Sequence, residues 1–222
     1  MSDHQDLCEM YGRSPDDPEF IDDLIDELSE EEYEWFSENE DKNHFELLAK
    51  QLSSVGEILR LDVPQSARFS FLVMIYAHVV SALEGYLAGA FIHNVCNSEE
   101  LTRKLVESDP EFANRKFTLR EIYEQKDTLK LTVSTYLRGL IFHDLKKVVP
   151  MYRDVLSHRF EDLSWLFHAV KKRHDCVHRA GLDKDGEKID LTVDSIFELL
   201  GKAIDLATGV ERSLAELERK DL

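Results

Sequence analysis

The stretch 66–95 is the part of the sequence that most constrains the fold. Its apolar residues recur so often that an α-helix drawn through it is apolar on most sides. Such a helix is about 45 Å long at about 1.5 Å per residue, and it belongs at the centre of a bundle or in an interface. The 222 residues include only five prolines and nine glycines, so few positions interrupt helices. We therefore predict an all-α fold, an up-and-down helical bundle.

Apolar residues at helical spacing predict further helices along the chain. After a polar lead over 1–19, the predicted helices are 20–36, 45–61, 97–108, 118–125, 129–149, 162–181 and 192–217. Pro150 is expected to interrupt the helix that precedes it, and Asp162 to cap the next one. We expect residues 1–62 to form an acidic, partly flexible extension with short helices. Residues 63–222 are expected to form the bundle domain.

Negative charge is concentrated near the N-terminus. The formal net charge is −18, and 16–41 contains fourteen Asp or Glu and no Lys or Arg. The rest of the chain is close to balanced, so the net charge says little about the local field at the basic cluster 171–179. Two interpretations of the acidic segment stay open. It is a solvated face docked on the bundle, or an arm that covers a basic site by mimicking a phosphate backbone.

The cysteines and the N-terminal residues indicate the compartment. Cys8, Cys96 and Cys176 are odd in number and widely spaced, which fits neither a disulfide framework nor a CxxC metal pair. The first residues lack the basic and apolar regions of a signal peptide. The apolar stretch 69–91 is interrupted by polar residues, which argues against a membrane span. We expect a cytoplasmic protein with free thiols and no membrane partner.

The stretch 171–181 gathers two histidines, an aspartate, a cysteine and four cations, and it ends on a glycine. Cleavage of RNA without a metal needs a base for the 2′-OH proton, an acid for the leaving oxygen and a cation for the charge on phosphorus. Arg173 and His178 supply these types, with His174, Lys172 and Arg179 adjacent. On an ideal helix, however, Arg173 and His178 are separated by about 140° of rotation. Either the helix end relaxes, or a second copy of the chain completes the site.

Three other interpretations of this stretch remain open. His174 and His178 at i, i+4 resemble half of a helical zinc site, without an evident third ligand. Cys176 could act as a nucleophile beside a histidine. Finally, the charged residues could form only a salt-bridge and capping cluster at a helix end, where cations are favourable. Upstream, Glu84 is the one carboxylate in the middle of the apolar helix, and we expect it to have a basic partner because an unpaired buried charge costs several kcal/mol.

The run Arg173-His174-Asp175-Cys176-Val177-His178, an Arg-x4-His motif, resembles the signature of HEPN domains. The run Val80-Ser81-Ala82-Leu83-Glu84-Gly85-Tyr86-Leu87 is similar to an early HEPN helix. The turn 181–186 and the long final helix are similar to the stretch that comes after the motif in many bacterial members. The resemblance covers about 65–217 and implies an HEPN-like bundle, a homodimer whose motifs meet in a cleft, and a metal-independent RNase.

The resemblance also implies roles for single residues. Arg173 and His178 would be catalytic, His174 would be the polar residue after the arginine, and Glu84 would orient Arg173. The neighbouring cations Lys171, Lys172 and Arg179 would bind RNA. We expect an endoribonuclease that acts as a toxin or antiviral-defence effector, with no cofactor, no metal and no DNA partner. An antitoxin or other regulatory protein is a further expected partner. The alternative is a non-catalytic HEPN module that binds a partner protein or a nucleotide.

Overall fold

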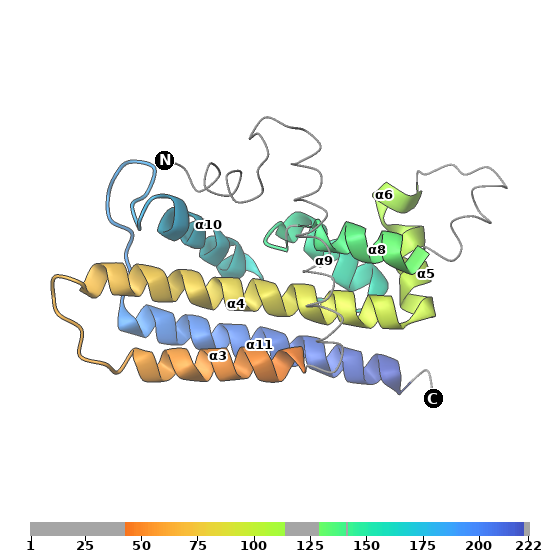
Figure 1. Ribbon diagram of the computed structural model, residues 1–222, viewed down its shortest axis with the longest axis horizontal. Helices are drawn as coiled ribbons and strands as arrows, with labels where there is room; N and C mark the ends of the chain where they lie inside the picture. Colours follow the sequence, from red (N-terminus) through yellow and green to blue (C-terminus); the bar gives the residue numbers. More distant parts are fainter. Residues whose placement is uncertain (1–42, 114–128, 141, 220–222) are drawn as a thin grey trace, which may run out of the picture. The chain divides into compact units, whose positions relative to one another are not determined.

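The computed structural model describes residues 43–113, 129–140 and 142–219 (Figure 1). Within these residues the secondary structure is α-helical, with no strand, which confirms the all-α prediction. The described helices are α3 (His44–Ile58), α4 (Arg68–Asn97), α5 (Glu99–Ser108), α6 (Pro110–Ala113), α8 (Leu129–Arg138), α9 (Leu145–Val155), α10 (Ser164–His178) and α11 (Val193–Glu218). The predicted helices 20–36 and 118–125 lie outside the described residues.

Helix α4 is the centre of the bundle. It contacts α3, α5, α8, α10 and α11, and Figure 1 shows α3 and α11 along one side of it and α10 along the other. The long helices α3, α4, α10 and α11 alternate in direction along the chain. The most deeply buried side chains of α4 lie within one broad arc of about 160° around the helix. They include Val79, Val80, Leu83, Leu87, Phe91 and Val95.

Two buried tyrosines join α4 to its neighbours through hydrogen bonds. The Tyr86 hydroxyl donates to Glu211 Oε1 at 2.7 Å and also lies 3.1 Å from the Ala207 carbonyl oxygen, both on α11. The Tyr152 hydroxyl on α9 donates to the Leu87 carbonyl at 2.6 Å. Because a buried hydroxyl needs a partner, these bonds fix how α9 and α11 sit against α4.

By length and composition, α4 could also cross a membrane, and it is the one described helix that passes this test. However, 44% of its most apolar window is buried inside the protein, and core helices of soluble proteins pass the same test.

The domain boundary differs from the predicted one. The compact unit begins at Asn43, and α3 packs against both α4 and α11. The predicted helix 45–61 lies within the expected extension 1–62. Its side chains Leu48, Leu52 and Val55 are buried in the bundle, which is a tertiary contact that a local sequence pattern does not reveal.

The predicted helix 129–149 is wrong in two respects. The structure ends α8 at Arg138 and starts α9 at Leu145, with Asp144 accepting a hydrogen bond from the Lys146 N–H at 3.3 Å. Pro150 lies inside α9 instead of interrupting it. Proline costs about 3 kcal/mol in a helix interior. Burial of neighbouring side chains on the core face of α9 offsets this cost; these are Val148, Met151, Tyr152 and Val155.

Candidate active site

Helix α10 carries the Arg-x4-His motif, and both of its ends are held. At the N-terminus Asp162 Oδ1 accepts the Ser164 N–H at 2.9 Å, although Leu163 is the N-cap residue. At the C-terminus the Asp175 carbonyl accepts N–H groups from Arg179 at 3.1 Å and Gly181 at 3.0 Å. Asp162 therefore lies next to the N-cap instead of being the N-cap, and α10 ends at His178, three residues before the predicted end at Gly181.

Gly181 is required by its backbone and by its neighbours. Its φ is +83°, in the left-handed region, and a Cβ there would lie 2.5 Å from Val73 Cγ2 and 2.9 Å from Phe69 Cζ. Both neighbours belong to α4. The end of the motif helix thus lies directly against the central helix, and this close approach positions the motif.

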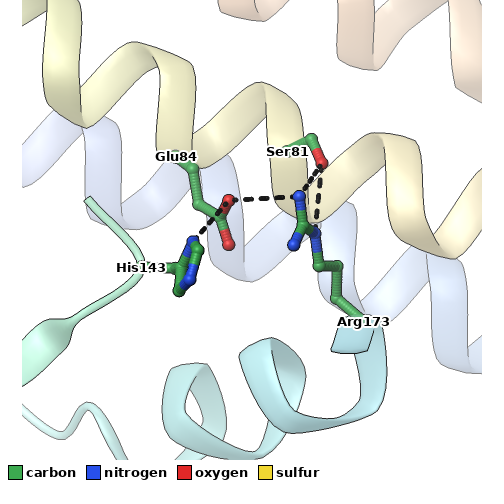
Figure 2. Close-up of polar contacts among 4 residues, drawn as sticks. All are labelled: Ser81, Glu84, His143 and Arg173. Carbon is green, nitrogen blue, oxygen red and sulfur yellow. Dashed lines mark hydrogen bonds and ion pairs between the residues drawn. The ribbon is translucent and has the colours of Figure 1, made fainter. Parts of the chain in front are cut away.

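Figure 2 shows the contacts that connect the motif to α4. The Arg173 Nε and Nη2 atoms each lie 3.4 Å from Ser81 Oγ, and Nη2 lies 3.9 Å from Glu84 Oε2. The side chains of Arg173 and Glu84 are 22% and 13% exposed, so the pair is mostly removed from water. The basic partner predicted for Glu84 is therefore Arg173, which lies far from it in the sequence.

His143 is a third member of this cluster that the sequence did not reveal. It lies in the turn between α8 and α9, and its Nδ1 is 3.7 Å from Glu84 Oε2 (Figure 2). Its side chain is 42% exposed. Because the sequence predicted a continuous helix through 129–149, His143 showed no local signal of a site. Only the packing of this turn against α4 brings it to Glu84.

Burial dominates the electrostatics of Glu84. Removal from water raises the pKa of this carboxyl, and the charges of Arg173 and His143 oppose that rise. Its Oε1 atom is buried and has no hydrogen-bond partner among the described residues. One oxygen of the carboxylate therefore faces two basic side chains, and the other has no hydrogen-bond partner among the described residues. A buried oxygen without a partner lowers the stability of the folded state, which is unusual for a residue with a purely structural role.

A pocket of about 330 Å³ opens beside this cluster. It is lined by His143, Val170, Lys171, Arg173, His174, Asp175, His178 and Arg179. Arg173 and His178 therefore line one concavity, although about 140° of helix rotation separates them. The pocket follows a wide arc of the α10 surface, and His174 lies between the two on that arc. Four of the basic groups come from α10, and one histidine comes from the turn before α9.

The three cations predicted to bind RNA differ in their surroundings. Lys171 and Arg179 line the pocket, but Arg179 also forms an ion pair with the buried Asp175 at 2.5 Å. Lys172 does not line it. Its Nζ donates to the Asp190 carbonyl at 3.0 Å and lies 5.6 Å from the centre of the Tyr76 ring. The contacts of Lys172 and Arg179 thus stabilise the helix end, as the capping interpretation anticipated.

The structure bears on two other interpretations of this stretch, a zinc site at His174 and His178 and a nucleophilic Cys176. The His174 and His178 rings lie 4.5 Å apart between centroids. Among the described residues, no group of three or more His, Cys, Asp or Glu side chains is placed to hold a metal ion. Cys176 is buried, and burial raises the pKa of its thiol to about 11. A thiol with that pKa is protonated at neutral pH, so Cys176 is poorly suited to act as a nucleophile.

Comparison of the chain with family models, with curated proteins and with solved structures finds no match. The residues of the pocket and their geometry are therefore the basis on which a function can be inferred.

Proposed function

We propose that this protein is a metal-independent endoribonuclease of the HEPN type, acting in the cytoplasm as a toxin or antiviral-defence effector. One observation supports this most: Arg173, held against the buried Glu84, lines a single pocket with His143, His174 and His178. The pocket thus combines a guanidinium with three imidazoles, which are the side-chain types that phosphodiester cleavage through the 2′-OH needs.

The reaction transfers two protons and exchanges one bond at phosphorus. A neutral imidazole, which we assign to His178, accepts the 2′-OH proton while the 2′-oxygen attacks phosphorus. The bond from phosphorus to the 5′-oxygen breaks, and an imidazolium donates its proton to that oxygen. We assign this second role to His143, whose Nδ1 lies 3.7 Å from Glu84 Oε2 beside the pocket. Arg173 stabilises the charge on the phosphoryl oxygens. The products are a 2′,3′-cyclic phosphate and a 5′-hydroxyl.

The decisive experiment measures RNA cleavage by the purified full-length chain in excess EDTA. Arg173→Ala and His178→Ala should each lower the cleavage rate, and loss of a proton-transfer group typically costs about 10²–10⁴-fold. His168→Ala is the matched control, because His168 is exposed on the same helix and does not line the pocket. If the wild-type chain and all variants cleave equally, or if neither the wild-type chain nor a chain starting at Asn43 cleaves RNA, the proposal is wrong.

The second candidate is a non-catalytic module that binds a partner protein or a nucleotide. It is favoured by the stabilising contacts of Lys172 and Arg179 and by the fourteen carboxylates of 16–41. Comparison of the full chain with a chain starting at Asn43, where the compact unit begins, separates the candidates. Gain of RNase activity in the shorter chain means that the acidic segment inhibits an enzyme. Loss of complex formation without any RNase activity supports the module.

A further inference from the structure

A second and larger pocket lies away from the Arg-x4-His motif, with a volume of about 720 Å³. One wall is the segment 158–163, which connects α9 to α10, together with Trp165 in the first turn of α10. The other wall is one face of α11. Residues at helical spacing form that face, namely Lys202, Asp205, Leu206, Gly209, Arg212 and Ser213. None of these residues lines the candidate active site.

The connecting segment is held rigidly by its aromatic residues. His158 is only 7% exposed, and its Nδ1 lies 2.8 Å from Ser213 Oγ on α11. The Phe160 ring packs edge-on against His158 at 4.5 Å and against Tyr152 at 5.1 Å. The pocket therefore has a formed wall instead of an adaptable loop, which is the usual property of small-molecule sites.

The charged residues around the pocket are not equally available. Lys202 is paired with Glu198 at 2.5 Å, and Asp162 accepts hydrogen bonds from Ser164. Arg159, Glu161 and Arg212 are exposed and form no ion pair with another described residue. Asp205 is about 10 Å from Arg212 along the axis of α11, at about 1.5 Å per residue. An anion at Arg212 thus lies two helical turns from that carboxylate.

The apolar part of the lining includes two aromatic side chains. Phe160 and Trp165 are both half-buried, so their rings contribute surface to the pocket and remain accessible. Gly209 also lines the pocket, and a Cβ there would be 3.8 Å from His158 Cε1, at ordinary contact distance. A side chain at this position can therefore be introduced without a clash at its Cβ.

We propose that this pocket binds a small ligand in which a flat aromatic ring is joined to a phosphate. The ring stacks on the aromatic wall, where base–aromatic stacking is worth about 1–3 kcal/mol. The phosphate binds the free guanidinium groups of Arg159 and Arg212, which can donate two parallel hydrogen bonds. The carboxylate of Asp205 can accept a hydrogen bond from a ring amine at the far end. This proposal is independent of the proposed RNase activity.

The fluorescence of Trp165 can report whether a ligand binds in this pocket. The chain has two tryptophans, so Trp35→Phe leaves Trp165 as the only tryptophan reporter. Titration of this full-length variant with adenosine monophosphate or phenyl phosphate should quench its fluorescence in a saturable way. The two probes separate a nucleotide from a simpler aryl phosphate. Adenosine has the aromatic ring without the phosphate, and inorganic phosphate lacks the ring. Each should bind at least tenfold more weakly than adenosine monophosphate. Equal binding of adenosine and adenosine monophosphate would overturn the proposal.

Two substitutions locate the binding in this pocket. Gly209→Met should fill it and abolish the quench, whereas Gly201→Met, an exposed glycine of the same helix outside the pocket, should leave it unchanged. Arg212→Gln, a surface change that does not depend on core packing, should weaken the phosphate ligands at least tenfold but not adenosine. Arg173→Ala should have no effect. If Arg173→Ala abolishes binding and Gly209→Met does not, the ligand occupies the candidate active site and the proposal is wrong.

Discussion

Glu84 is the residue on which burial and charge oppose each other most directly. Its carboxyl is 13% exposed, one oxygen faces Arg173 and His143, and the other has no hydrogen-bond partner within the described part of the chain. Burial raises its pKa more than the two basic groups lower it. The folded state therefore binds a proton at Glu84 more readily than the unfolded chain does, and this fixes the sign of its contribution to stability.

Substitution of Glu84 by Gln should show how the contribution of Glu84 to the free energy of unfolding changes with pH. Above the ordinary carboxyl pKa of 4.5, the folded protein binds more protons at Glu84 than the unfolded chain, so stability from this group is lost as the pH rises through its raised pKa. The variant lacks this loss. Its free energy of unfolding minus that of the wild-type chain should therefore increase from pH 4 to pH 7, measured by urea denaturation. A difference that decreases would mean that attraction to Arg173 and His143 outweighs burial.

The buried histidines should produce the opposite slope. Burial lowers the pKa of His158, and burial together with His93 lowers that of His44. The unfolded chain then binds more protons below the ordinary histidine pKa of 6.5, so stability should fall as the pH drops from 6.5 toward the lowered values. One titrating histidine contributes a slope of at most about 1.4 kcal/mol per pH unit.

His158→Gln should therefore flatten the dependence of the free energy of unfolding on pH below 6.5. Substitution of the exposed His168 by Gln controls for the general effect of removing an imidazole. The cause assigned to the slope is wrong if the two variants follow the same curve.

At the scale of elements, the close approach of the α10 end to α4 decides where the motif lies. Gly181 comes after α10, and a side chain there would collide with Val73 and Phe69 of α4. The loop after it closes through an isolated bridge between Leu182 and Lys188 and leads to the Thr192 capping box of α11. The motif helix is thus held between two defined turns.

Gly181→Ala should destabilise the protein by about 1–3 kcal/mol through left-handed backbone strain and by a further amount through the collision. Gly186→Ala is a matched control, because its φ is also +83° but no atom of the described residues lies within 4 Å of a Cβ there. The difference between the two variants in urea denaturation measures the collision alone. Equal losses would mean that the contact of the α10 end with α4 is adaptable.

At the scale of the whole molecule, we propose that two copies pair through α4 and α10. Large apolar side chains are exposed on both helices: Met74 is 63% exposed on α4, and Phe167 and Val177 are 48% and 50% exposed on α10. Together with the position of the candidate site on α10, these exposed side chains support pairing through the two helices.

Light scattering after gel filtration tests the pairing. The wild-type chain should elute with twice its mass of 25.8 kDa. Met74→Glu should shift it to the mass of one chain, because a carboxylate would be buried in the interface. Leu61→Glu, at a residue that is also 63% exposed but lies between α3 and α4, should not. Elution of an RNA-cleaving wild-type chain at the mass of one chain would show that pairing is not needed.

The sequence by itself determined the helical character of this protein and the approximate extent of α10. These properties are encoded locally, in apolar residues at helical spacing and in residues such as Asp162 and Gly181 that end helices. It also indicated that Glu84 needs a partner, because a charge inside an apolar helix is costly whatever surrounds it.

Only the tertiary structure decided which groups meet. The packing of α10 on α4 brings Arg173 to Glu84, and a turn inside the predicted helix 129–149 brings His143 to the same carboxylate. Burial of the core face also carries α9 through Pro150 and includes α3 in the bundle. Such contacts join residues distant in sequence, and their energies depend on burial in the assembled core, which no local pattern of residues contains.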